Sequence, residues 1–139
     1  MDKRIIDWQE FDDLVDKIVE NYRQHDIKLI VGISRGGLPL AVKLSNILKV
    51  PMECLSWQTR DGDVQDVSHL TKLDIRYQTE DVLFVDDICD SGHTIQSIAG
   101  LFYHPNFTTL VDKIPQSNLV QYSPLIIETQ AWIQFPWEQ

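Results

Sequence analysis

Residues 82–94, VLFVDDICDSGHT, join an apolar run to three carboxylates and a small polar turn. The adjacent carboxylates of Asp86 and Asp87 suit a divalent cation or the hydroxyls of a sugar. The turn that follows, from Asp90 to Thr94, leads from a strand into a helix, and its backbone N–H groups suit a phosphate. The segment therefore points to a magnesium-bound, phosphorylated sugar, unless it is a plain polar turn in which Asp90 caps the next helix.

Three other features of the chain could complete such a site. Ser34-Arg35-Gly36-Gly37 follows another apolar run, and glycine pairs allow backbone angles that aim several N–H groups at one anion. Lys113 is the one basic residue from position 77 onward, in a stretch that holds eight acidic residues. An aromatic segment, Trp132-Ile133-Gln134-x-Pro136-Trp137, comes later. The glycine turn alone is a common pattern, and Arg35 as an ordinary surface residue is its alternative reading.

Together these segments resemble the type I phosphoribosyltransferase family. Its signature is an apolar strand, two acidic residues and Asp-Ser/Thr-Gly-x-Thr, which residues 82–94 match. Ser-Arg-Gly-Gly-Leu at 34–38 and Trp-Ile-x-x-Pro-Trp at 132–137 are similar to segments of its xanthine-guanine, or 6-oxopurine, branch. The resemblance runs from about Lys28 to Trp137. His93 departs from it, because many relatives carry glycine there.

The resemblance implies a site for phosphoribosyl pyrophosphate (PRPP). Asp86 and Asp87 are expected to engage the ribose hydroxyls, directly or through Mg²⁺, which makes them the expected metal ligands. The loop around the 5′-phosphate is expected to consist of Asp90, Ser91, Gly92, His93 and Thr94. The pyrophosphate is expected at Ser34, Arg35, Gly36 and Gly37. His93 is expected to face solvent and contribute its N–H, with a cationic side chain at low pH as the alternative.

The resemblance also implies a purine site in the last part of the chain. Lys113 is expected to hydrogen-bond a 6-oxo group, because an ammonium group only donates and so disfavours a 6-amino group. Trp132 is expected to stack on the base, a contact worth about 1–3 kcal/mol, and Ile133 to offer backbone groups to the base edge. Asp90 is the expected catalytic residue, placed to accept the N7 proton. Trp137 is expected to be a packing residue.

The expected function is purine salvage, in which the 5-phosphoribosyl group passes from PRPP to xanthine, guanine or hypoxanthine and pyrophosphate is released. Two alternatives stay open: a phosphoribosyltransferase for another base, and a regulatory protein that binds PRPP without turnover. The residues do not decide which 6-oxopurine is preferred. A loop over 56–66, with Ser56-Trp57 where relatives often carry Ser-Tyr and with Arg60 near the pyrophosphate, either closes over the site or stays exposed.

Alternating strands and helices must position these loops. Asp7 and Glu10 form a capping box, and the helix that follows has apolar spacing that places Trp8 and Tyr22 in the core. Further helices are expected over 39–48, with apolar positions Leu40, Val42, Leu44, Ile47 and Leu48, and over 95–102. Strands are expected over 28–33, 51–57, 82–85, 108–111 and 125–127, while 67–76 is ambiguous. The expected fold class is α/β: a mainly parallel, twisted sheet flanked by helices, with ligands at the strands' carboxyl ends.

Length and composition set the remaining expectations. The 139 residues suffice for one domain, with a core over about 1–112 and a small C-terminal purine-binding hood over about 113–139. A formal charge of −9 argues against a nucleic-acid-binding module. With no signal peptide, no long apolar run and two cysteines outside any metal pattern, a cytoplasmic protein without membrane insertion is expected. The resemblance implies a homo-oligomer, dimer or tetramer.

Overall fold

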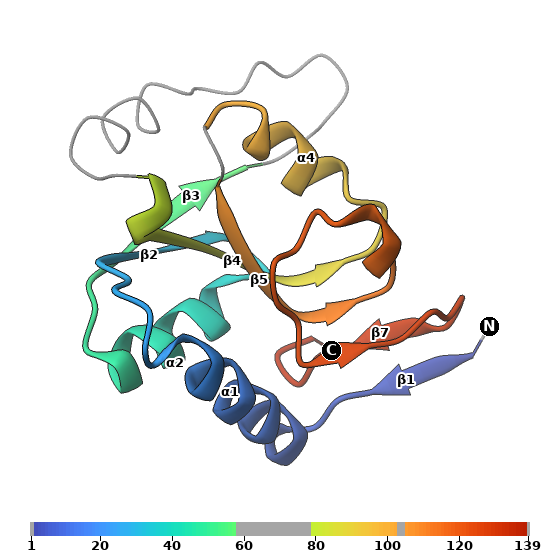
Figure 1. Cartoon of the computed structure of the whole chain (residues 1–139). Coiled ribbons are helices and arrows are strands. Elements are labelled where there is room, and N and C mark those ends of the chain that lie inside the picture. The colour runs from blue at the N-terminus through green and yellow to red at the C-terminus, as the bar shows by residue number, and fades with distance from the viewer. Residues whose placement is uncertain (1, 58–78, 103–104, 139) are drawn as a thin grey trace.

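A parallel five-stranded sheet with the strand order β3-β2-β4-β5-β6 forms the centre of the fold (Figure 1). This computed structural model describes residues 2–57, 79–102 and 105–138. The strands are β2 (Leu29–Ser34), β3 (Met52–Ser56), β4 (Val82–Cys89), β5 (Asn106–Asp112) and β6 (Leu125–Ile126). Because these strands run in the same direction, their carboxyl ends share one edge of the sheet. The expected fold class is confirmed.

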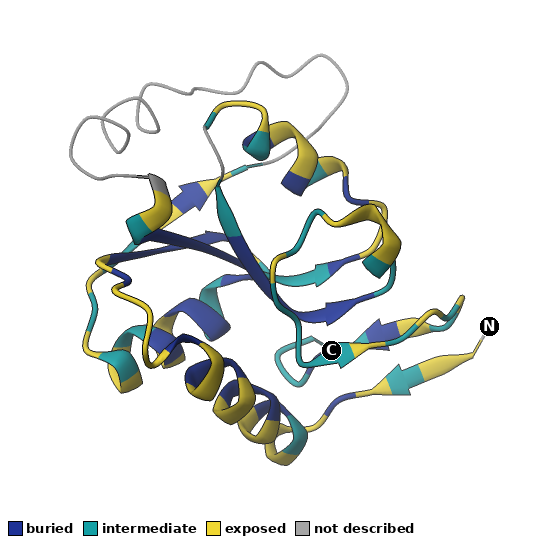
Figure 2. Ribbon diagram, viewed as in Figure 1, coloured by how far each residue is buried: buried dark blue, intermediate teal, exposed yellow. Residues whose placement is uncertain are grey.

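Helices cover both faces of this sheet. Helices α1 (Trp8–Tyr22) and α2 (Leu38–Leu48) lie on one face, and α4 (His93–Ala99) lies on the other (Figure 1). Alternate residues of the central strands face opposite sides, so Leu83 and Val85 join the core under α1 and α2, whereas Phe84 joins the core under α4. The central strands and the inner sides of the helices are accordingly buried (Figure 2).

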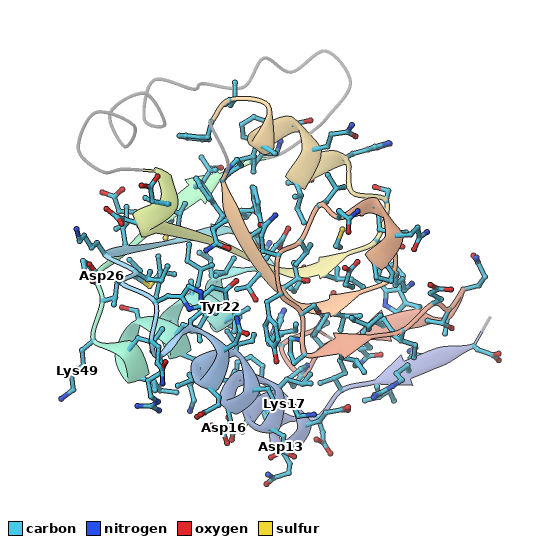
Figure 3. The ribbon with its side chains drawn as sticks, in the orientation of Figure 1. Asp13, Asp16, Lys17, Tyr22, Asp26 and Lys49 are labelled. Carbon is cyan, nitrogen blue, oxygen red and sulfur yellow. The ribbon has the colours of Figure 1, made fainter. Side chains whose placement is uncertain are left out.

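Helix α1 begins as the sequence predicts. The Asp7 carboxylate accepts a hydrogen bond from the Glu10 N–H over 2.8 Å, which confirms the N-cap. Tyr22 is buried and points toward the sheet, while Asp13 and Lys17 point away from it (Figure 3). The expectation for Trp8 is wrong, because its side chain is 56% exposed. It lies in the first turn, where its ring meets Phe11 and Trp137 at the edge of the core.

Helix α2 is buried along a narrower stripe than expected. Leu40, Ala41 and Leu44 are fully buried against the sheet. Val42 and Ile47, two other apolar residues of this helix, are exposed. Val42 lies on the side of the helix opposite this stripe, whereas Ile47 lies beside the stripe in the last turn of the helix.

A small second sheet, which the sequence did not predict, joins strands from the two ends of the described chain. Strand β1 (Lys3–Ile5) pairs in parallel with β7 (Trp132–Gln134). The Trp132 N–H donates to the Asp2 carbonyl over 3.0 Å, and the Ile6 N–H donates to the Gln134 carbonyl over 2.9 Å. Three-residue strands show too little alternation to be found by pattern.

The connections include two short 3₁₀ helices, η1 (Thr79–Asp81) and η2 (Pro115–Ser117). Apart from Ser56 and Trp57, the expected loop over 56–66 lies outside the described residues, as does the ambiguous segment 67–76. Within the described ranges, no helix is both long enough and apolar enough to cross a membrane.

Candidate functional site

Strand β4 continues through the acidic pair, so the expectation that it ends at Val85 is wrong. The reason lies in its two neighbours. Strand β5 pairs with β4 as far as Cys89, opposite Asp112, whereas the pairing with β2 ends at Val85, opposite Gly32. Asp86 and Asp87 therefore belong to the part of β4 that pairs with β5 but not with β2.

The glycine turn at 34–37 packs directly against the acidic pair. A Cβ atom added to Gly36 would lie 2.3 Å from Oδ2 of Asp87, and one added to Gly37 would lie 2.4 Å from the carbonyl oxygen of Val85. Only residues without a side chain can bring the two segments this close. The peptide bond between Ser34 and Arg35 is cis, and Arg35 is exposed.

One backbone group of this turn differs from the expectation. The Gly37 N–H donates to the Ile33 carbonyl over 2.8 Å, so it is not aimed at an external anion. What fixes glycine at this position is its close approach to β4 rather than a free N–H group.

The carboxylates of Asp86 and Asp87 share a half-buried position. The Asp87 N–H donates to Oδ1 of Asp86 over 2.8 Å. Burial, and then the neighbouring Asp87 carboxylate, raise the pKa of Asp86 to about 8, and burial raises the pKa of Asp87. Two adjacent carboxylates in such a place resist carrying two negative charges unless a cation or hydroxyl donors neutralise them.

A magnesium ion fits this carboxylate pair. Mg²⁺ is commonly held by one or two carboxylates, with water and substrate phosphates completing its shell. Among the described residues, no group of three His, Cys, Asp or Glu side chains is placed to hold a metal. Asp86 and Asp87 would therefore hold the ion together with ligand oxygens rather than in a closed protein site.

The loop after β4 forms a small cavity. Residues 86–95 line it, and its volume is about 220 Å³. Gly92 has a φ of 84°, and a Cβ there would lie 2.6 Å from Leu119. Gly92 is also the N-cap of α4, without a side-chain cap, so the alternative that Asp90 caps this helix is wrong. His93 is exposed, and its N–H lies 3.4 Å from Oγ of Ser91.

A second cavity, of about 480 Å³, adjoins the first. It is lined by Asp90, Lys113, Ile114, Gln116, Glu128, Thr129 and Gln130. Asp90 is therefore common to the two cavities. Nζ of Lys113 donates to the Ala131 carbonyl over 2.8 Å and lies 3.8 Å from Oδ1 of Asp90. The lysine side chain is only 9% exposed, so its ammonium group is held in place.

Asp112 orients the turn that carries Lys113. It is buried at the end of β5, where its carboxylate accepts a hydrogen bond from the Ile114 N–H over 3.0 Å, and Cys89 is its register partner on β4. Burial raises the pKa of Asp112, and burial followed by the Asp112 charge raises the pKa of Cys89 to about 12. Asp112 was not predicted from the sequence, although an acidic residue that ends an apolar run and precedes Lys113 was the available signal.

The aromatic segment lies outside the lining of the second cavity. Trp132 is 55% exposed on β7 and is not among the residues that line the second cavity. The Ile133 side chain is buried in the core. Because the Trp132 N–H and the Gln134 carbonyl face β1, the backbone groups of Ile133 point to the other edge of β7. Trp137 stacks on Phe135 with ring centroids 5.1 Å apart, which confirms it as a packing residue.

No sequence motif marks Ala131 or the polar wall of the second cavity, which consists of Gln116 and Glu128–Gln130, so these residues were not predicted. Another cavity, of about 690 Å³, lies at the opposite edge of the sheet, where Tyr22, Glu80 and Asn106 line it. It contains none of the expected site residues. The chemistry-bearing side chains gather at the carboxyl edge.

Known proteins resemble this chain in sequence and in fold. A sequence model of the phosphoribosyl transferase domain matches residues 2–104. A xanthine-guanine phosphoribosyltransferase of Chromohalobacter salexigens is 27% identical over 138 residues, covering 96% of this chain and 82% of that protein. One of Cereibacter sphaeroides is 26% identical over 115 residues, covering 80% and 69%. The crystal structure of a purine phosphoribosyltransferase from Pyrococcus horikoshii superposes with a TM-score of 0.78 at 28% identity, covering 100% and 95%.

Proposed function

This chain belongs to the phosphoribosyltransferase family, and we propose that it transfers the 5-phosphoribosyl group of PRPP to a 6-oxopurine and releases pyrophosphate. The family match ends before Lys113, so it covers the two loops assigned to PRPP and, of the residues that line the second cavity, only Asp90. The choice of a purine rests on the relatives named above and on the chemistry of that cavity.

The position of Asp90 carries the proposal. Asp90 lines both the cavity of residues 86–95 and the second cavity, which contains Lys113. A ribose 5-phosphate in the first cavity and a base in the second would meet at this residue. The bond between C1′ and N9 of the base would form there as the bond between C1′ and pyrophosphate breaks.

The pyrophosphate end of PRPP is assigned to the contact between the glycine turn and the acidic pair. Arg35 lies at this turn, exposed to solvent, and a guanidinium group suits a diphosphate. Asp86 and Asp87 would hold the Mg²⁺ ion and engage the ribose hydroxyls. When bound, the ion would neutralise part of the charge that develops on the leaving pyrophosphate.

The second cavity matches one edge of a 6-oxopurine. Asp90 Oδ1, Lys113 Nζ and the Ala131 carbonyl oxygen follow one another at 3.8 and 2.8 Å. This series of acceptor, donor and acceptor is complementary to N7–H, O6 and N1–H of the base. Adenine offers an amino group opposite Lys113 and an unprotonated N1 opposite the carbonyl, so it mismatches both.

In this arrangement Asp90 accepts the N7 proton as N9 forms its bond to C1′. Lys113 donates to O6, which orients the base and disperses the charge that develops on it. The exposed indole of Trp132 is assigned to stacking on the base once it is bound.

A panel of bases tests the proposed function. The purified protein with PRPP and Mg²⁺ should convert guanine, hypoxanthine or xanthine to the nucleoside monophosphate, with one pyrophosphate released per turnover, and should use adenine poorly. Trp132→Ala should raise the KM for the base and leave the KM for PRPP unchanged. PRPP binding without product from any of the four bases would instead indicate a regulatory protein.

A further inference from the structure

We infer that Glu128 makes the base cavity selective for guanine over xanthine. This inference rests on the proposed function and adds to it the choice among the 6-oxopurines. It concerns position 2 of the base, which bears an amino group in guanine, an oxo group in xanthine and hydrogen in hypoxanthine.

The order of groups along the cavity places position 2 of the base near residues 128–130. In the proposed arrangement, N7–H faces Asp90, O6 faces Lys113 and N1–H faces the Ala131 carbonyl. C2 is the next ring atom after N1. The chain segment that leads into Ala131, Glu128 to Gln130, lines the same cavity. The Thr129 hydroxyl accepts from the Ala131 N–H over 3.0 Å, which fixes this segment relative to the carbonyl.

Hydrogen-bonding capacity singles out Glu128 on this wall. The polar side chains of the cavity besides Asp90 and Lys113 are Gln116, Glu128, Thr129 and Gln130. The two amides and the hydroxyl both donate and accept, so they can serve an amino or an oxo group equally. The ionised carboxylate of Glu128 only accepts, so it binds the amino group of guanine and opposes the oxo group of xanthine.

The charge of the cavity acts in the same direction. Among its described residues, the ionisable side chains are two carboxylates, Asp90 and Glu128, and one ammonium group, Lys113. That ammonium is already bonded to the Ala131 carbonyl. Xanthine loses a ring proton more readily than guanine does. Anionic xanthine in this cavity would be repelled, because the lining carries a net negative charge and the whole chain has a formal charge of −9.

Glu128→Gln tests the inference because it keeps the size of the side chain and restores a donor. The wild-type protein should show its highest kcat/KM with guanine and its lowest with xanthine. In the variant, the ratio of guanine to xanthine kcat/KM should fall about tenfold, which is the loss of one charge-assisted hydrogen bond. The kcat/KM for hypoxanthine should change by less than about twofold.

Glu20→Gln is the matched control, because it removes the same charge from the exposed side of α1. It should leave the ratio as in the wild type. Calorimetric titration with GMP and XMP repeats the comparison without turnover, and Glu128→Gln should narrow the difference between their affinities. Both variants change exposed residues, so unchanged thermal unfolding is expected.

The outcomes separate this inference from the proposed function. An unchanged ratio in Glu128→Gln, while hypoxanthine is still converted, overturns the role of Glu128 and leaves the function intact. If no base is converted, the proposed function fails, and the GMP and XMP titrations still decide whether Glu128 discriminates at position 2.

Discussion

Nζ of Lys113 lies 3.8 Å from Oδ1 of Asp90, although the two residues come from different strand ends of the sheet. Asp90 follows β4 and Lys113 follows β5, and these strands pair as far as Cys89 and Asp112. The Lys113 N–H also donates to the Cys89 carbonyl over 3.0 Å, which continues the pairing by one residue. The register of two neighbouring parallel strands thus sets the spacing between the proposed proton acceptor and the group that would bind O6.

Lys113→Met should lower kcat/KM for guanine and hypoxanthine by about 10- to 100-fold, because it removes a charged donor from a mostly buried position. The weak use of adenine should change little, so the 6-oxo preference should shrink. Steady-state kinetics with the four bases measure this. Lys43→Met, on the exposed side of α2, is the control. A preference that persists unchanged would remove Lys113 from base recognition.

Asp90→Asn should lower kcat by about 10²–10⁴ with little change in PRPP affinity, because the amide cannot accept the N7 proton but keeps the shape of the loop. Single-turnover kinetics and calorimetric titration with PRPP separate the two effects. Asp13→Asn, on the outer side of α1, should match the wild type (Figure 3). Equal losses of PRPP affinity and kcat would make Asp90 a binding residue only.

Gly36→Ala should weaken PRPP binding strongly, because the new methyl group would lie 2.3 Å from the Asp87 carboxylate and would push the two segments apart. Gly100→Ala is a matched substitution at the end of α4, where the nearest atom would lie 3.6 Å away, and it should bind PRPP normally. Equal PRPP affinities in the two variants would contradict the close packing of the glycine turn on Asp87.

Asp86→Asn should be at least as resistant to thermal unfolding as the wild type near pH 7.5 in EDTA, because burial and Asp87 oppose ionisation of this carboxyl and hold its pKa at about 8. The same variant should lose most of its Mg²⁺-dependent PRPP binding, since a carboxylate ligand is gone. Differential scanning calorimetry and PRPP titrations with and without Mg²⁺ measure the two effects. Substantial destabilisation would show that the acidic pair supports the fold.

The free energy of unfolding should fall as the pH rises from about 10 to about 12, because an unfolded tyrosine ionises near pH 10 while burial raises the pKa of Tyr22 to about 12. Between these two pH values Tyr22 stays protonated in the folded state but ionises in the unfolded state, so a rising pH favours unfolding. Tyr22→Phe should remove this part of the pH dependence in urea unfolding. It should also cost about 1 kcal/mol at neutral pH through the lost hydrogen bond to Asn106.

Much of the fold could be read from local patterns. The N-cap at Asp7, the alternation of strands and helices, and the placement of both loops at strand ends follow from residue spacing, which reports which side of an element is apolar. The same patterns could not show that Trp8 and Ile47 are exposed, because the burial of the first or last turn of a helix depends on what packs against it. The pairing of β1 with β7 was likewise invisible, since three residues carry no reliable period.

The candidate site likewise combines features that the sequence shows with features that only the packing of the chain determines. The sequence by itself determined which residue types are present: the acidic pair, the Asp90 loop, the glycine turn and one lysine in an acidic half. Only the tertiary structure decided that Gly36 touches Asp87, that Asp90 borders both cavities, and that Ala131 and Glu128 share a wall with Lys113. These contacts join segments 15 to 51 positions apart, and strand register and packing, which no local pattern encodes, set their distances.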